Sequence, residues 1–193
     1  MTRVRLEAFS DGVIAILITI MVLELKIPHG ADWTALRAAL PEFLTYTLSF
    51  ALLGIYWTNH HHLFHTVEHV TGGILWANLH LLFWLSLVPF TTAWVGTNPR
   101  APLPAAVYGI VFLLAALAWT ILQKAIIAHH GPQSKLAQAL GRDTKGKLSN
   151  AIYAAAVPLA FVHPWIADAL YVVVALWWIV PDRRIESRHR HED

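Results

Sequence analysis

The chain contains no cysteine, which excludes disulfide bonds and thiolate chemistry. It also contains few charges: Asp, Glu, Lys and Arg make up 13% of its 193 residues, whereas a soluble domain has about a quarter. No Ser/Gly-rich linker divides it, and no Gly-rich phosphate loop follows a strand-like segment, which argues against a nucleotide site. Hydrophobic residues make up 56%, and several apolar runs approach 20 residues in length. Together these features predict a polytopic membrane protein.

Six apolar segments are predicted to be transmembrane helices, so the expected fold class is all-α. The expected spans are residues 9–27, 41–64, 73–95, 105–128, 148–162 and 165–180, within a single domain of residues 1–193. The last two are short, and a helical hairpin is the alternative for them. Pro89 is expected to kink the third span near its end. Asp32 is expected to cap a small surface helix over residues 32–40.

Basic residues are distributed unevenly between the two sides of these spans. With the N-terminus inside, eleven of the 14 Lys and Arg residues fall in cytoplasmic segments and three fall outside. Lys and Arg are enriched in cytoplasmic loops. We therefore expect a multi-pass membrane protein with both termini in the cytoplasm. Membrane lipid is an expected partner, and nucleic acid is not.

The first span carries a narrow stripe at helical spacing on one face. Its members are Gly12, Ile16, Thr19, Ile20 and Leu23. A polar cluster of Arg5, Ser10 and Asp11 precedes it, and ionisable groups at the mouth of a span are costly unless they are paired or hydrated. One interpretation is that the stripe lines a pore while the cluster holds the helix in place. By itself, such a stripe more often indicates helix packing.

The polar cluster belongs to a longer motif, R-x-x-x-F-S-D-G. Its residues are Arg5, Phe9, Ser10, Asp11 and Gly12. The second span contains YWTNHH at residues 56–61, and the third contains Trp76-x-Asn78 and Pro89-Phe90. In this order the elements resemble the transmembrane protein 175 potassium-channel family, in its prokaryotic single-repeat branch. The resemblance covers the whole length of the chain.

The resemblance implies a homotetramer of six-helix subunits in the plasma membrane of a prokaryote. The first helix of each subunit lines a central pore. It places a hydrophobic gate at Ile16 and further pore lining at Thr19, Ile20 and Leu23. A ring of isoleucines resists wetting, so a permeating ion loses part of its hydration shell there. No TVGYG-like run is present, which excludes a carbonyl filter of the usual kind. The expected function is passive, potassium-preferring conduction without a cofactor, leaving open permeation by other monovalent cations or protons.

The resemblance also implies a supporting network among the first three spans. Asp11 does not share a helix face with Arg5, so its expected partner lies on another helix, with His60, His61 and Asn78 as candidates. The expected role is structural and gating support rather than ion coordination. The predicted members are Arg5, Phe9, Ser10, Asp11, Gly12, His60, His61 and Asn78.

Histidines concentrate between His60 and His69. His61, His65 and His69 follow one another at intervals of four with Glu68 among them, a spacing that can bind zinc or a di-iron centre. The cluster runs into a loop and no second His-rich box matches it, so we predict a titratable patch and no metal site.

Two alternative functions stay open: an ion-coupled secondary transporter, for which no internal repeat is evident, and a His-based membrane metalloenzyme. The favoured prediction is a protein that is not an enzyme.

Overall fold

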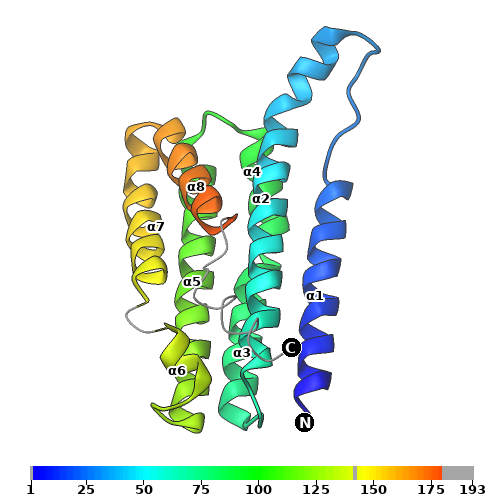
Figure 1. Cartoon of the computed structure of the whole chain (residues 1–193). Helices are drawn as coiled ribbons and strands as arrows, with labels where there is room; N and C mark the ends of the chain where they lie inside the picture. Colours follow the sequence, from blue (N-terminus) through cyan, green and yellow to red (C-terminus); the bar gives the residue numbers. More distant parts are fainter. Residues whose placement is uncertain (1, 141–142, 180–193) are drawn as a thin grey trace.

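The computed structural model describes residues 2–140 and 143–179. All regular structure within these residues is helical, which confirms the all-α fold class. The helices are α1 (Arg3–Leu23), α2 (Trp33–His65), α3 (Gly72–Ser86), α4 (Val88–Thr97), α5 (Pro102–His130), α6 (Lys135–Leu140), α7 (Thr144–Val162) and α8 (Pro164–Ile179). Figure 1 shows α1 at one edge of the bundle and α7 with α8 toward the other. The expected sixth-span end at residue 180, Arg142 and the basic residues from Arg183 to Arg190 lie outside the described residues.

Four helical stretches of the described chain are long and apolar enough to cross a membrane: α1, α2, α3 with α4, and α5. They support a multi-pass membrane protein. Helix α8 is apolar but has 16 residues, which span about 24 Å where the bilayer core measures about 30 Å. It packs against α7, and the two helices meet at His163 as a hairpin. Six spans in each subunit therefore stay a prediction.

Helix α1 begins earlier than the expected first span. Thr2 caps it, with its hydroxyl oxygen accepting a hydrogen bond from the Arg5 amide. The helix ends at Leu23, four residues before the expected end at residue 27. The whole polar motif therefore lies on the first turns of the same helix that carries the apolar stripe, so the two features share one rigid element.

The start of α2 confirms one prediction and corrects another. Asp32 is its N-cap, with Oδ1 accepting a hydrogen bond of 2.8 Å from the Ala35 amide. The separate surface helix expected over residues 32–40 is wrong, because these residues continue into the second span with Pro41 inside the helix. A proline removes one intrahelical hydrogen bond and bends a helix without always ending it. Figure 1 shows the N-terminal end of α2 leaning away from the rest of that helix.

The third expected span is divided into two helices next to Pro89, where the sequence predicts a kink. Helix α3 ends at Ser86, and α4 begins at Val88 with Pro89 in its first turn. Proline is tolerated there because the first amides of a helix have no intrahelical acceptor. The short α4 packs inside the bundle. The Thr92 and Ser49 hydroxyls lie 2.7 Å apart there, and the Ser49 hydroxyl lies 3.0 Å from the Tyr108 hydroxyl. These buried contacts join α4, α2 and α5 and set the frame against which α1 packs.

Candidate functional site

Helix α1 has one buried face and one exposed face. The buried face packs against α2, α3 and α4 and consists of Leu6, Ser10, Ile14, Leu17 and Met21. The predicted stripe lies on the exposed face: Ile16 is 57% exposed, Ile20 40% and Leu23 80%, and Gly12 and Thr19 are also exposed. An apolar stripe at the edge of a bundle needs lipid, another subunit or a pore beside it. The structure therefore brings the predicted pore residues together on a surface that this chain leaves open.

Thr19 differs from its neighbours on the stripe because it carries a hydroxyl. Its Oγ1 donates to the carbonyl oxygens of Ala15 at 3.1 Å and Ile16 at 2.9 Å. The single hydroxyl hydrogen is thus used within the helix. The lone pairs of the oxygen stay available on the exposed side, where they can accept a hydrogen bond from water or face a cation.

A buried polar chain links the first three spans. Ser10, His60 and Asn78 are each 0% exposed. His60 Nε2 lies 2.8 Å from Asn78 Oδ1, and Asn78 Nδ2 donates to Ser10 Oγ at 2.9 Å. Ser10 Oγ in turn donates to the Leu6 carbonyl at 2.9 Å. Three predicted network residues from α2, α3 and α1 therefore form one continuous chain of hydrogen bonds.

This chain fixes the tautomer of His60. Because the Asn78 amide nitrogen donates to Ser10, the Asn78 oxygen is the atom that faces His60 and accepts. His60 must then carry its proton on Nε2. Its other nitrogen, Nδ1, is buried without a hydrogen-bond partner among the described residues, while the ring stacks on Phe64 at 4.5 Å. The Asn78 oxygen is therefore the partner on which this buried imidazole depends.

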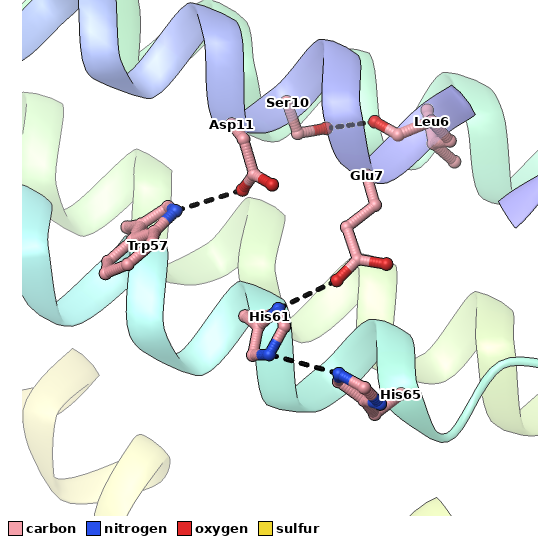
Figure 2. A network of polar contacts seen from close by, with 7 residues as sticks. All are labelled: Leu6, Glu7, Ser10, Asp11, Trp57, His61 and His65. Carbon is pink, nitrogen blue, oxygen red and sulfur yellow. Dashed lines mark hydrogen bonds and ion pairs between the residues drawn. The ribbon is translucent and has the colours of Figure 1, made fainter. Parts of the chain in front are cut away.

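A second set of contacts lies at the more exposed side of the α1–α2 interface. The Trp57 indole nitrogen donates to Asp11 Oδ1 at 3.0 Å, and His61 Nδ1 lies 2.8 Å from Glu7 Oε1 (Figure 2). The partner of Asp11 is thus Trp57 and none of the three expected residues, because His60 and Asn78 point into the core and His61 meets Glu7. Two carboxylates of α1 consequently contact two aromatic side chains of α2.

Glu7 and Trp57 are the residues that sequence reasoning missed. Glu7 lies four residues before Asp11, and Trp57 lies four before His61. Residues four apart share a helix face, so two such pairs on neighbouring helices can meet in register. Figure 2 shows this ladder, with Asp11 opposite Trp57 and Glu7 opposite His61. The repeated spacing was the available signal.

Three members of the predicted network take no part in these contacts. Arg5, Phe9 and Gly12 are exposed on α1, on the side that also carries the apolar stripe. Among the residues that the structure describes, none forms a hydrogen bond or ion pair with the Arg5 side chain. Their inclusion in the network stays a prediction.

Residues 5–89, which contain the motif, the stripe and both networks, match the family model described as endosomal/lysosomal potassium channel TMEM175. A potassium channel from a Chryseobacterium species is 54% identical over 187 residues, covering 97% of each protein. The chain belongs to the TMEM175 family. A second relative, a potassium channel of Streptomyces collinus, is 33% identical and covers 90% of this chain. The family resemblance of the sequence is therefore confirmed.

The fold of this TMEM175 family member also has a counterpart among solved structures. The crystal structure of a lysosomal potassium-selective channel TMEM175 homologue from Chamaesiphon minutus superposes with a TM-score of 0.79 at 30% identity, covering 92% of this chain and 96% of that one. The human endosomal/lysosomal proton channel TMEM175 is 39% identical over 83 residues, which are 16% of its length. The family and these relatives are ion channels, which confirms the prediction that the chain is not an enzyme.

Proposed function

We propose that this TMEM175 family member is a passive, potassium-preferring cation channel assembled from four copies of the chain. In this proposal α1 of each copy lines the pore, Ile16 forms the gate, and Thr19, Ile20 and Leu23 line the pore further along. The open apolar stripe on α1 is the observation that carries the proposal. A relative named as a potassium channel and aligned over 97% of both chains adds support. Potassium is the permeant ion, and no cofactor takes part.

The gate works through hydration in this proposal. Four isoleucine side chains around the axis offer an ion no oxygen ligand and resist wetting, so a crossing ion gives up part of its water shell. Potassium holds its water less tightly than sodium and therefore meets the lower barrier. Thr19 lies one turn further along α1, where its free lone pairs can receive the ion or its water. The resulting preference for potassium is modest because no carbonyl cage is present.

The position of α1 supports an assembly of several copies. A pore lined by one helix of each subunit must be completed by other copies, and α1 stands at the edge of the bundle (Figure 1). Arg5, Phe9 and Gly12 lie on its open side and would meet neighbouring subunits there. With the basic residues on the inside, the tetramer sits in the plasma membrane with both termini in the cytoplasm.

Ion flux from reconstituted liposomes tests the proposal. Vesicles loaded with potassium are diluted into sodium or N-methylglucamine buffer, and the membrane potential is followed with a dye. We expect rapid potassium efflux that scales with the driving force and needs no second ion, and a smaller response when sodium replaces potassium inside. Flux that requires a proton or sodium gradient would instead indicate a coupled carrier.

Proton permeation is tested in the same vesicles. The human relative is named as a proton channel and matches the first part of this chain, including α1. A pH-sensitive dye trapped in the vesicles reports proton entry while a potassium gradient sets the voltage. We expect the potassium current to exceed the proton current at neutral pH, because potassium is far more concentrated than protons. Proton entry without potassium efflux would contradict a potassium-preferring pore.

Asp11→Ala is expected to reduce the yield of assembled tetramer more than it changes ion preference. The substitution removes the acceptor of the Trp57 indole, a bond to a charged group worth about 1.5–3 kcal/mol, and thereby loosens α1 from α2. Size-exclusion chromatography measures the tetramer fraction, and liposome flux measures the potassium-to-sodium ratio. Asp11→Asn keeps an acceptor and serves as the control, with an intermediate loss. A stable Asp11→Ala tetramer with an altered ion preference would contradict a supporting role.

A further inference from the structure

Three metal-ligating side chains meet at the end of the α1–α2 contact. Glu7, His61 and His65 each offer one ligand atom, and these atoms all lie within 4.8 Å of one another. His61 and His65 are exposed, and Glu7 is partly buried. The group is therefore open to ions from solvent, and it draws on two helices that are far apart in the sequence.

The hydrogen bonds within the group orient it for metal binding. Glu7 Oε1 lies 2.8 Å from His61 Nδ1, so the carboxylate accepts the proton on Nδ1 and leaves His61 Nε2 to act as an electron-pair donor. His61 Nε2 faces His65 Nε2 at 3.0 Å (Figure 2). Two nitrogens bound to one tetrahedral zinc are about 3.3 Å apart, given Zn–N bonds of about 2.0–2.1 Å. The distance between the two Nε2 atoms therefore has to increase only from 3.0 Å to about 3.3 Å for both to bind one zinc ion.

We propose that His61 and His65 bind a divalent transition-metal ion of the zinc class through their Nε2 atoms, with Glu7 holding His61 from α1. A carboxylate that accepts the second ring proton of a ligating histidine is a frequent outer partner at zinc sites. Water completes the coordination, since the two imidazoles are exposed. Imidazole nitrogens select zinc, copper or nickel over magnesium and calcium, which prefer oxygen ligands.

This site differs from the one that the histidine spacing suggested. His69 continues the interval of four only if the helix continues, but α2 ends at His65 with Thr66 as its C-cap. His69 and Glu68 lie in the following loop, where their backbone amides face His130 Nε2 at 3.4 and 3.3 Å. The proposed site thus contains two histidines of the sequence pattern, His61 and His65. Glu7 is its third member in place of Glu68 and His69. The proposal thereby departs from the expectation of no metal site.

The consequence of the site rests on the proposed channel function. A metal ion tied to α2 through two imidazoles and to α1 through the Glu7 carboxylate stabilises the observed contact between these helices. A ligand shifts an equilibrium toward the state that it binds more tightly. In the proposed channel, where α1 lines the pore, bound zinc holds α1 in the position that it has in this structure. We accordingly expect micromolar zinc to reduce potassium efflux from liposomes.

Zinc binding to the purified protein tests the site without requiring conduction. The protein is prepared with an affinity tag that contains no histidine, and zinc affinity is measured by competition with a chromophoric chelator. We expect one zinc ion per chain and a rise in melting temperature on zinc addition. His65→Ala removes a ligand and should weaken binding at least about 100-fold, while Glu7→Gln should weaken it about 10- to 100-fold. His69→Ala is the matched control and should bind like the native protein.

The outcomes separate the proposals. Equal zinc affinity in the native protein and His65→Ala, or equal losses in His65→Ala and His69→Ala, would overturn the site. Zinc inhibition of efflux that disappears in His65→Ala supports the regulatory role, whereas binding without inhibition overturns that role alone. Absence of potassium efflux in zinc-free vesicles counts against the channel proposal and leaves the binding result standing.

Discussion

Ile16→Asn is expected to increase potassium efflux from liposomes at least about tenfold and to bring the potassium-to-sodium ratio closer to one. Asparagine nearly matches isoleucine in length but carries a carboxamide, so four copies would convert an apolar ring into a polar one. Water then enters the constriction, and an ion crosses with more of its hydration shell. A tenfold gain corresponds to a barrier lowered by about 1.4 kcal/mol, less than one new hydrogen bond to a charged group.

The control for this variant needs an exposed apolar residue on the same helix but away from the stripe. Val22 is 46% exposed against 57% for Ile16 and lies about 120° around α1 from it. Val22→Asn should leave efflux close to the native value. Unchanged efflux in Ile16→Asn would remove Ile16 from the gate. Equal increases in both variants would mean that a polar residue anywhere on α1 loosens the assembly.

Asn78→Leu is expected to destabilise the protein by about 1–3 kcal/mol, because it leaves the buried Nε2–H of His60 without an acceptor. The loss is large because the other nitrogen of this ring already lacks a partner among the described residues, so the whole imidazole becomes unsatisfied. Ser10 is less affected, since its hydroxyl still donates to the Leu6 carbonyl. For a chain of this size, the melting temperature in detergent should fall by roughly 2–12 °C.

Asn59→Leu provides the comparison for this stability measurement. Asn59 is partly buried on α2, and its amide donates to the Ile55 carbonyl of its own helix at 2.8 Å. Its removal breaks a hydrogen bond within α2 and none between helices, so the loss should be about 1 kcal/mol or less. Similar losses in the two variants would show that the chain from His60 through Asn78 to Ser10 contributes nothing beyond an ordinary amide. A larger loss in Asn78→Leu places the stabilisation in the link between α1, α2 and α3.

Local patterns in the sequence were sufficient for most of the helices and for the apolar stripe on α1. Apolar length identified the long helices, and Pro89 marked the break between α3 and α4 because a proline has no amide hydrogen to donate. Pro41 carries the same chemistry but lies inside α2, so proline alone does not decide between a bend and an end. Helical spacing also placed Ile16, Ile20 and Leu23 on one face, and that face is exposed.

The hydrogen-bond partners of the polar side chains on α1 depend on how the helices pack against one another. The spacing of residues along one helix does not specify that packing. Asp11 had three candidate partners in the sequence, and its partner is a fourth residue, Trp57. Which side chains of α2 face α1 is set by how the buried residues of both helices pack, and a rotation of either helix would pair different residues. The buried position of His60 and the exposed position of the adjacent His61 illustrate this, since one residue step turns a helix by about 100°.

The sequence by itself determined that this protein is an all-helical membrane protein of the TMEM175 family with an apolar stripe on its first helix. These properties follow from composition, motif and period, each of which is local to a segment. The tertiary structure decided that Ser10, Asn78 and His60 share one buried chain and that Glu7 joins His61 and His65 in a group that can hold a metal ion. It did so because α2 ends at His65 and packs against α1 in one register, and both facts depend on the packing of the whole bundle.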